Sequence, residues 1–321
     1  MTFNSQFSKQ PLLNVVLVGQ PDYFEICHPG IDLDWGLISF LPFSSGGNET
    51  QLRYDLLELQ PDVVIVYKPE MLQSNCLEGV NATRIGWFTE PVTRTDKASI
   101  AQNHATRQRW GEGIARDSND LQRRLDNAKG VVKENYDIFV SFDPLTLPAL
   151  NEFVSVEHAF PLPVGDRTFC TTPETFSTRP RRLTFIGRST PYRDQFLLPI
   201  LHEYDPLYIC HGLHGNDLDY VMANTGIGLN LHNDHYPNFE NRVPIHLARG
   251  HLVISEPLSP SHGLEPGQDF VEITSPDELA AVLNNIWDDP EPFRLIAIRG
   301  REKAEYFRSS NILQKVAHLV P

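Results

Sequence analysis

The chain has 321 residues, of which 40% are hydrophobic and 21% are charged, so it is long enough for about two domains with sizeable cores. Its formal net charge of −14 at pH 7 argues against general binding to nucleic acids or anionic membrane surfaces, because both would repel it. Residues 1–10 lack the features of a signal peptide, and no apolar run reaches membrane-spanning length. The four cysteines show no CxxC spacing, which favours a reducing compartment. We therefore expect a cytoplasmic protein without a membrane span.

The first half of the chain predicts a parallel α/β arrangement. Apolar runs suited to buried strands lie at 12–19, 61–69, 84–91 and 136–144. Residues 55–60 resemble the end of a helix, and the polar stretch 95–135 fits either a solvated helix pair or a loop. Strands separated by helical segments indicate βαβ units and a parallel sheet.

Residues 161–182 interrupt this pattern with Pro, Thr and Ser, which predicts an interdomain linker. A second α/β series follows. Strands are predicted at 182–187, 206–210, 226–232, 251–255 and 269–273. Helices are predicted at 193–204, 216–224, 241–250 and 275–289, followed by a helical, basic tail at 291–319. We expect an Asn cap to open the second of these helices, and Ser275 with Pro276 to open the fourth. The expected domains are residues 1–165 and 180–321.

Cationic residues follow the predicted strands of the second half, where open α/β sheets bind ligands. Gly187 and Arg188 end one strand, and Arg193 opens the next helix. His232 ends another strand, and Arg242 begins the helix after it. Arginine offers phosphate a permanent charge and a planar fork of donors, and helix N-termini add backbone N–H groups. This pattern in an acidic protein predicts a pocket for a small phosphate-bearing ligand.

Structural interpretations of the same arginines stay open. Arg188 could be a surface residue and Arg193 part of an ordinary first turn. Arg242 could form a surface ion pair with Glu240 or Asp234, which contributes little stability. A cation at a helix start is electrostatically unfavourable, which favours a functional interpretation of Arg242.

Two histidine-rich loops, HGLHG at 211–215 and HNDH at 232–235, invite a metal interpretation. No second ligand cluster of fixed spacing supports it, so we expect no metal. Further on, Glu265 and Asp269 fit either contacts to hydroxyl groups of a ligand or a solvated acidic loop.

The order of motifs resembles the spore-maturation-type glycosyltransferases, a family of GT-B architecture. The second half contains FIGRSTPYR, GIGLNLH, an N-x-R segment before a small-residue helix, PG-x-D and S-x-x-EL, and the first half adds QPDVVIVYKP, IGWFTEP and YDIFVSFDP. The resemblance implies an α/β fold with two Rossmann-like domains facing a cleft and a C-terminal helical tail. It also implies metal-independent transfer of a sugar from a nucleoside-diphosphate sugar to a hydroxyl group, without a cofactor. The acceptor would be a small molecule, a glycan or a protein.

The resemblance also suggests roles for individual residues. The donor would be bound by Gly187, Arg188, Arg193, His232, Arg242 and Glu265. For a base that accepts the proton of the acceptor hydroxyl we select Asp22, in the loop after the first strand, and Glu90, at a later strand end. Strand-end carboxylates also often cap the next helix, and a retaining mechanism needs no protein base. Glu25, His28 and Asp143 are the rivals.

One position departs from the family pattern. Related transferases usually have a Glu three residues beyond the N-x-R arginine, where it holds the donor ribose, and this chain has Ile245 there. Isoleucine cannot accept a hydrogen bond, so Glu240 or another group would have to substitute, or donor binding is altered or lost. The alternative function is therefore a catalytically silent module that binds a nucleotide, a sugar or a partner protein.

Overall fold

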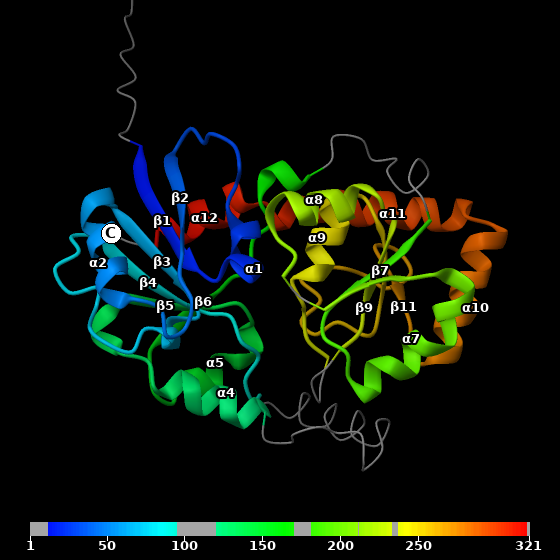
Figure 1. Ribbon diagram of the computed structural model, residues 1–321, viewed down its shortest axis with the longest axis horizontal. Coiled ribbons are helices and arrows are strands. Elements are labelled where there is room, and N and C mark those ends of the chain that lie inside the picture. The colour runs from blue at the N-terminus through cyan, green and yellow to red at the C-terminus, as the bar shows by residue number, and fades with distance from the viewer. Residues whose placement is uncertain (1–11, 95–119, 170–180, 211, 233–236, 320–321) are drawn as a thin grey trace, which may run out of the picture.

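The computed structural model describes residues 12–94, 120–169, 181–210, 212–232 and 237–319, and two parallel sheets organise them (Figure 1). The first sheet has six strands in the order β2-β1-β3-β4-β5-β6, and the second has five in the order β11-β10-β9-β7-β8. The expected α/β fold with two Rossmann-like halves is confirmed. The histidines at 211 and 235, Asp234 and most of the polar stretch 95–135 lie outside the described residues.

The first half contains β1 (Leu13–Gly19), β2 (Gly36–Pro42), β3 (Val63–Tyr67), β4 (Thr83–Phe88), β5 (Ile138–Ser141) and β6 (Val156–Ala159). Its α-helices are α1 (Pro21–Phe24), α2 (Glu49–Leu59), α4 (Asp120–Lys129) and α5 (Leu147–Leu150). The sequence prediction missed β2 and β6, which are the two edge strands. Both are partly exposed and carry polar residues, so neither has the continuous apolar run of a strand buried on both faces.

The second half contains β7 (Leu183–Ile186), β8 (Leu207–Ile209), β9 (Ile227–Asn230), β10 (Leu252–Ser255) and β11 (Val271–Glu272). Its helices are α7 (Pro191–Tyr204), α8 (Gly215–Ala223), α9 (Arg242–Ala248), α10 (Pro276–Asp288) and α11 (Glu291–Lys303). All five strands predicted here are present. The Ser275 cap is confirmed, since its side chain accepts a hydrogen bond from the backbone N–H of Glu278 at 3.2 Å. The expected Asn cap of α8 is wrong, because the helix begins at Gly215, ahead of Asn216.

The central strands are buried on both faces. In β1, Val16 and Val18 belong to the apolar cluster on one face of the first sheet, and Val15 and Leu17 belong to the cluster on the other. All four side chains are fully buried. Strands buried in this way are rigid, so they hold the residues at their carboxyl ends in fixed positions.

The last helix, α12 (Ser309–Ala317), returns to the first half (Figure 1). Ile312, Leu313 and Val316 are buried in the same cluster as Val15 and Leu17 of β1. The backbone N–H of Ser309 also donates to the carbonyl of Val164 at 2.9 Å. The end of the chain therefore ties the second half to the first.

Arg94, which forms a buried ion pair inside the first half, adds a further tie to the second half. The Arg94 guanidinium contacts the Asp143 carboxylate at 2.7 Å, and both side chains are almost completely buried. The same guanidinium donates to the carbonyls of Pro237 and Ser259, at 3.1 Å and 2.6 Å, in loops of the second half. Asp143 is thus committed to a structural contact and is not an accessible base.

Candidate functional site

A cavity of about 540 Å³ is lined by residues of both halves. From the second half, residues after β7, around α8 and at the start of α9 contribute to its wall. From the first half, the loop after β1, the ends of β3 and β4, and helix α4 contribute. The cavity therefore lies at the carboxyl ends of strands in both sheets, where open α/β sheets bind ligands.

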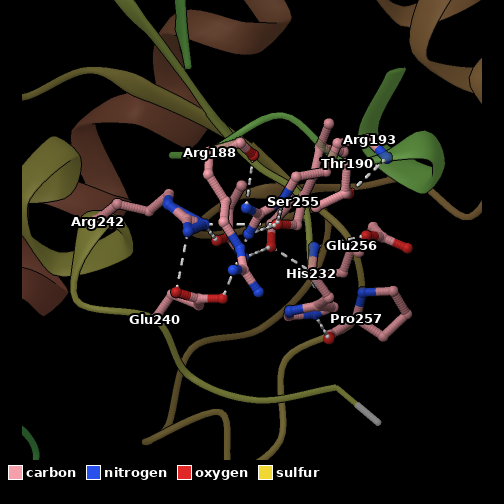
Figure 2. Close-up of polar contacts among 11 residues, drawn as sticks. Arg188, Thr190, Arg193, His232, Glu240, Arg242, Ser255, Glu256 and Pro257 are labelled. Atoms are coloured by element: carbon pink, nitrogen blue, oxygen red, sulfur yellow. Dashed lines mark hydrogen bonds and ion pairs between the residues drawn. The ribbon is translucent and has the colours of Figure 1, made fainter. Parts of the chain in front are cut away.

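Four of the predicted donor-site residues, Gly187, Arg188, Arg193 and Arg242, line this cavity. Figure 2 shows the polar contacts of the three arginines. A Cβ atom on Gly187 would lie 3.3 Å from Nη1 of Arg193 and 3.5 Å from Nη2 of Arg242, so the missing side chain lets both guanidiniums approach the main chain. Arg188 is exposed, and within the described part of the chain its guanidinium makes no hydrogen bond or ion pair. This guanidinium is available to a ligand.

Arg193 also lines the cavity, but its guanidinium is bound to the main chain. Its Nε and Nη2 donate to the carbonyl of Leu231 at 3.0 Å and 2.9 Å, and its Nη1 donates to the carbonyl of Arg188 at 3.0 Å. Arg193 is only 3% exposed. It therefore joins the loop after β7 to the loop after β9 and fixes the main chain from which Arg188 projects.

Arg242 is held between two side chains. Its Nη1 donates to Asn230 at 3.0 Å, and its Nη2 pairs with Glu240 at 2.9 Å. Burial raises the pKa of Glu240, but the guanidiniums of Arg242 and Arg193 outweigh it and hold that pKa below its usual value. Glu240 is therefore ionised, and the predicted Arg242–Glu240 pair exists inside the cavity wall rather than on the open surface.

His232 and Glu265 do not line the cavity. The His232 ring is 1% exposed, and its Nε2 contacts the carbonyl of Pro257 at 2.7 Å (Figure 2). Its backbone N–H donates to Glu256 at 2.7 Å, so this residue ties the end of β9 to the end of β10. Glu265 is exposed in a separate turn, where its backbone N–H donates to Asp269 at 2.9 Å. His232 is nevertheless close to the arginines, because the carbonyl of Leu231 before it accepts hydrogen bonds from Arg193 (Figure 2).

Ile245 lies in the cavity wall and is 9% exposed. It belongs to an apolar cluster with Leu218 and Met222 of α8. No carboxylate occupies this position, and Glu240 is the acidic residue of the same segment that lines the cavity.

On the first-half side, Asp22 lines the cavity and meets a residue of the second half. His214, the residue before α8, lies 3.5 Å from Asp22 through Nε2 and 2.8 Å from Glu25 through Nδ1. The bond to Glu25, followed by the charges of Glu25, Asp22 and Asp217, raises the pKa of His214 against the opposing effect of burial. The acidic loop after β1 is therefore linked to α8 across the cavity.

Glu90, the other selected base, is engaged in ion pairs. Its Oε1 contacts Nζ of Lys68 at 2.9 Å, and its Oε2 lies 3.6 Å from Nε of Arg124. All three residues line the cavity. Glu90 thus holds two cations in the first-half wall.

Sequence reasoning missed Glu70, which follows β3 in a short 3₁₀ turn (Pro69–Met71). Its side chain lines the cavity and is 9% exposed, and its Oε2 is buried without a hydrogen-bond partner in the described part of the chain. Burial raises the pKa of Glu70 to about 7, although its own backbone N–H and Lys68 oppose the shift. The signal available in the sequence was an acidic residue just after a predicted strand, the same feature that singled out Glu90.

Among residues 12–94, 120–169, 181–210, 212–232 and 237–319, no cluster of three or more His, Cys, Asp or Glu side chains could hold a metal ion. The helices in these ranges include none with the length and apolar character needed to cross a bilayer.

No protein-family model matches this chain, and no curated protein sequence does. Solved structures match along almost its whole length. HepE from Anabaena in complex with UDP-glucose is 11% identical with a TM-score of 0.55, and the match covers 96% of this chain and 99% of HepE. Sucrose-phosphate synthase from Thermosynechococcus elongatus is 12% identical with a TM-score of 0.54, covering 96% of this chain and 98% of the synthase.

A third match is a UDP-forming α,α-trehalose-phosphate synthase from Burkholderia xenovorans, which is 10% identical with a TM-score of 0.56. It covers 96% of this chain and 98% of that one. These proteins are GT-B glycosyltransferases, and the chain shares their architecture. The expectation of a GT-B fold is therefore confirmed, and at these identities the likeness concerns the fold alone.

Proposed function

We propose that this protein transfers a sugar from a nucleoside-diphosphate sugar to a hydroxyl group of an acceptor. The observation that carries this proposal is the placement of Arg188 and Arg242 on the wall of a cavity between the two halves of a GT-B fold. The cavity is large enough for a nucleotide sugar, since ligand pockets typically enclose roughly 300–1,000 Å³. The likeness to HepE, which was solved with UDP-glucose, makes UDP the first nucleotide to test.

In this proposal the arginines act on the leaving group. Negative charge develops on the diphosphate as the bond to the sugar breaks, and fixed cations stabilise that charge in the transition state. Arg188 and Arg242 would contact the phosphates, while Arg193 would hold the loops in place through its bonds to Leu231 and Arg188. The main chain at Gly187 would approach the phosphates closely. No metal ion or cofactor is needed for this scheme, and the protein would act in the cytoplasm.

The acceptor would bind against the first-half wall. Asp22 and Glu90 line this wall, and an acceptor hydroxyl placed there would face the donor across the cavity. Donor and acceptor held together in this way react as if within one molecule, which lowers the entropic part of the barrier. The acceptor is proposed to be a hydroxyl-bearing small molecule, glycan or protein.

The second candidate is a catalytically silent nucleotide- or partner-binding module. Ile245 favours it, because this residue places an apolar side chain where a ribose-binding Glu was expected, and it packs with Leu218 and Met222. Donor binding and donor turnover must therefore be measured separately.

Calorimetric titration with UDP, GDP, dTDP and CMP tests both candidates, followed by release of nucleotide from the matching sugar donor with and without EDTA. We expect binding of one nucleotide, and turnover that EDTA does not reduce. Arg242→Ala should weaken binding about tenfold or more, because a charge-assisted pair with phosphate is lost. Arg182→Ala is the matched control, since Arg182 is exposed and pairs with Asp205 away from the cavity lining. Binding without turnover would support the silent module, and absence of binding would contradict both.

A further inference from the structure

Among the residues that the structure describes, four carboxylates line the cavity, and their surroundings differ. They are Asp22, Glu70, Glu90 and Glu240. Asp22 lies near His214, Glu90 pairs with Lys68 and Arg124, and Glu240 pairs with Arg242. In the described part of the chain, Glu70 alone among the four has neither an ion pair nor a side-chain partner, and its Oε2 is buried. A buried carboxylate oxygen without a hydrogen-bond partner is costly, so its presence requires an explanation.

We propose that Glu70 is the catalytic base that accepts the proton of the acceptor hydroxyl, and that the transfer inverts the anomeric centre. This inference rests on the proposed function and assigns the base of that same site. It replaces neither Asp22 nor Glu90 as contacts of the acceptor. It gives the proton to the carboxylate whose Oε2 is buried without a hydrogen-bond partner among the described residues.

The backbone around Glu70 is fixed in a way that suits this role. Lys68 adopts a left-handed conformation (φ 62°, ψ 67°), which is strained for a residue with a side chain. The turn is held by the Lys68 N–H, which donates to Trp87 at 2.9 Å, and by the Tyr136 hydroxyl, which donates to Pro69 at 2.9 Å. The Glu70 carbonyl accepts from Gln73 at 2.8 Å. The side chain is therefore presented to the cavity from a rigid turn at the end of β3.

The proton and electron balance is simple. The acceptor oxygen forms a bond to the anomeric carbon as its proton passes to the Glu70 carboxylate. The bond between the anomeric carbon and the phosphate oxygen breaks, and its electron pair leaves with the nucleoside diphosphate toward Arg188 and Arg242. The base lies on the first-half wall and the arginines lie on the second-half wall. Attack from the side opposite the leaving group inverts the configuration.

The pKa of Glu70, raised to about 7 by burial, also suits a base. A base with a pKa near the working pH combines a deprotonated fraction with enough proton affinity to act in the transition state. A carboxylate with an ordinary pKa would be deprotonated but weakly basic. Burial makes the ionised Glu70 carboxylate unfavourable, and for the same reason it raises the proton affinity that a base needs.

The first experiment measures release of UDP from UDP-glucose with water as acceptor, for the full-length protein and the variants Glu70→Gln, Glu70→Asp and Glu157→Gln. Glu157 is exposed on β6 and does not line the cavity, so its variant controls for the substitution itself. We expect Glu70→Gln to lower the rate about 100-fold or more while UDP affinity stays within twofold. The wild-type rate should rise with pH through about 7, and this rise should be absent in the Gln variant.

The second experiment identifies the anomer that forms. UDP-glucose is α-linked, so proton NMR recorded before mutarotation should show β-glucose as the first product. Release of α-glucose, or a Glu70→Gln variant with wild-type turnover, would overturn the proposal. Wild-type protein that binds no UDP would instead contradict a UDP-dependent form of the proposed function.

A third measurement does not depend on turnover. Carbon NMR of protein labelled at the glutamate carboxyl carbon, with the Glu70 signal identified by its loss in Glu70→Gln, gives the pKa directly. A midpoint near 7 supports the proposal. A midpoint below 5 would remove the basis for choosing Glu70, whatever the donor is.

Discussion

The arginines beside the cavity divide into two kinds, although they lie close together in space. Arg188 is exposed and contributes to the main-chain framework only through its carbonyl, which accepts a bond from Arg193. Arg193 is buried, and its guanidinium donates to the main-chain carbonyls of Leu231 and Arg188. One guanidinium can therefore serve a ligand, and the other maintains the loops.

This difference predicts opposite effects of the two alanine variants. Arg193→Ala should lower the free energy of unfolding by about 3 kcal/mol or more, because buried carbonyls lose charge-assisted partners. Arg188→Ala should change stability by less than about 0.5 kcal/mol, as is usual for an exposed position, and weaken nucleotide affinity about tenfold. Denaturant unfolding and calorimetric titration of both variants measure the two effects. Equal loss of stability in both variants would contradict a structural role for Arg193 and a ligand-binding role for Arg188.

For single residues, the sequence predicted the position of a side chain in the fold better than it predicted the groups that surround that side chain. It placed Gly187, Arg188 and Arg242 at strand ends and helix starts, and the cavity lies there. It could not distinguish Glu70 from Glu90, because both follow a predicted strand. They differ in burial and in partners, because Glu90 pairs with Lys68 after β3 and with Arg124 of α4, both of which are distant from it in sequence.

Among the elements, β9 and α9 pack unusually closely. Gly228 lies in the middle of β9, and a Cβ atom there would overlap the ring of His246 on α9. That ring is 1% exposed, and its Nδ1 lies 2.9 Å from Nδ1 of His251. Burial, with a smaller contribution from Arg242, lowers the pKa of His246 to about 3, so the ring is neutral. The second glycine of GIGLNLH is therefore required by helix packing rather than by a ligand.

Gly228→Ala should destabilise the protein by about 1–3 kcal/mol, because a well-packed core tolerates an added methyl group poorly. The matched control is the double variant Gly228→Ala with His246→Ala, in which the ring that would clash is absent. The double variant should lose less stability than the sum of the two single variants, with a coupling of about 0.5–3 kcal/mol. Denaturant unfolding provides all three values, and additive losses would disprove the close contact.

The central strands β3, β9 and β10 were predicted because their whole environment is apolar, and they have continuous or nearly continuous apolar runs. The edge strands β8 and β11 of the second sheet were also predicted, although they are only partly buried. The edge strands β2 and β6 have one neighbour and partial exposure, so their sequences carry a mixed signal. Edge position depends on topology, which local periodicity does not contain.

In the whole molecule, Arg94 pairs with Asp143 inside the first half and joins that half to the carbonyls of Pro237 and Ser259 in the second. Removing Arg94 would leave Asp143 buried without its partner, which typically costs about 3–5 kcal/mol. Arg94→Met should therefore lower the melting temperature markedly. Adding Asp143→Asn, which removes the charge but keeps the oxygen that accepts from Leu145, should restore part of the loss. Differential scanning calorimetry tests this, and no recovery in the double variant would contradict the ion-pair explanation.

The His214 contact should make the approach of the two halves sensitive to pH. Glu25, Asp22 and Asp217 favour the protonated ring, so the pKa of His214 is raised above 6.5. A group whose pKa is raised on folding contributes stability below its unfolded pKa, and this contribution is lost as pH rises through the folded value. The attraction between α8 and the loop after β1 should therefore weaken on the alkaline side of this pKa. Because the side chains are 34–44% exposed, salt should reduce the effect.

Proton NMR of the His214 ring tests this directly. Glu25→Gln should lower the measured pKa, because it removes the charge and the strongest hydrogen bond of the ring. Glu58→Gln, the same substitution at an exposed position of α2, should leave the pKa unchanged. If Glu25→Gln has no effect, the ring does not bridge the halves in solution. Asp22 also lines the cavity, so a bridging His214 ring would couple the acidic loop of the first half to the second-half wall. Binding of a nucleotide in the cavity should therefore shift the same His214 signal.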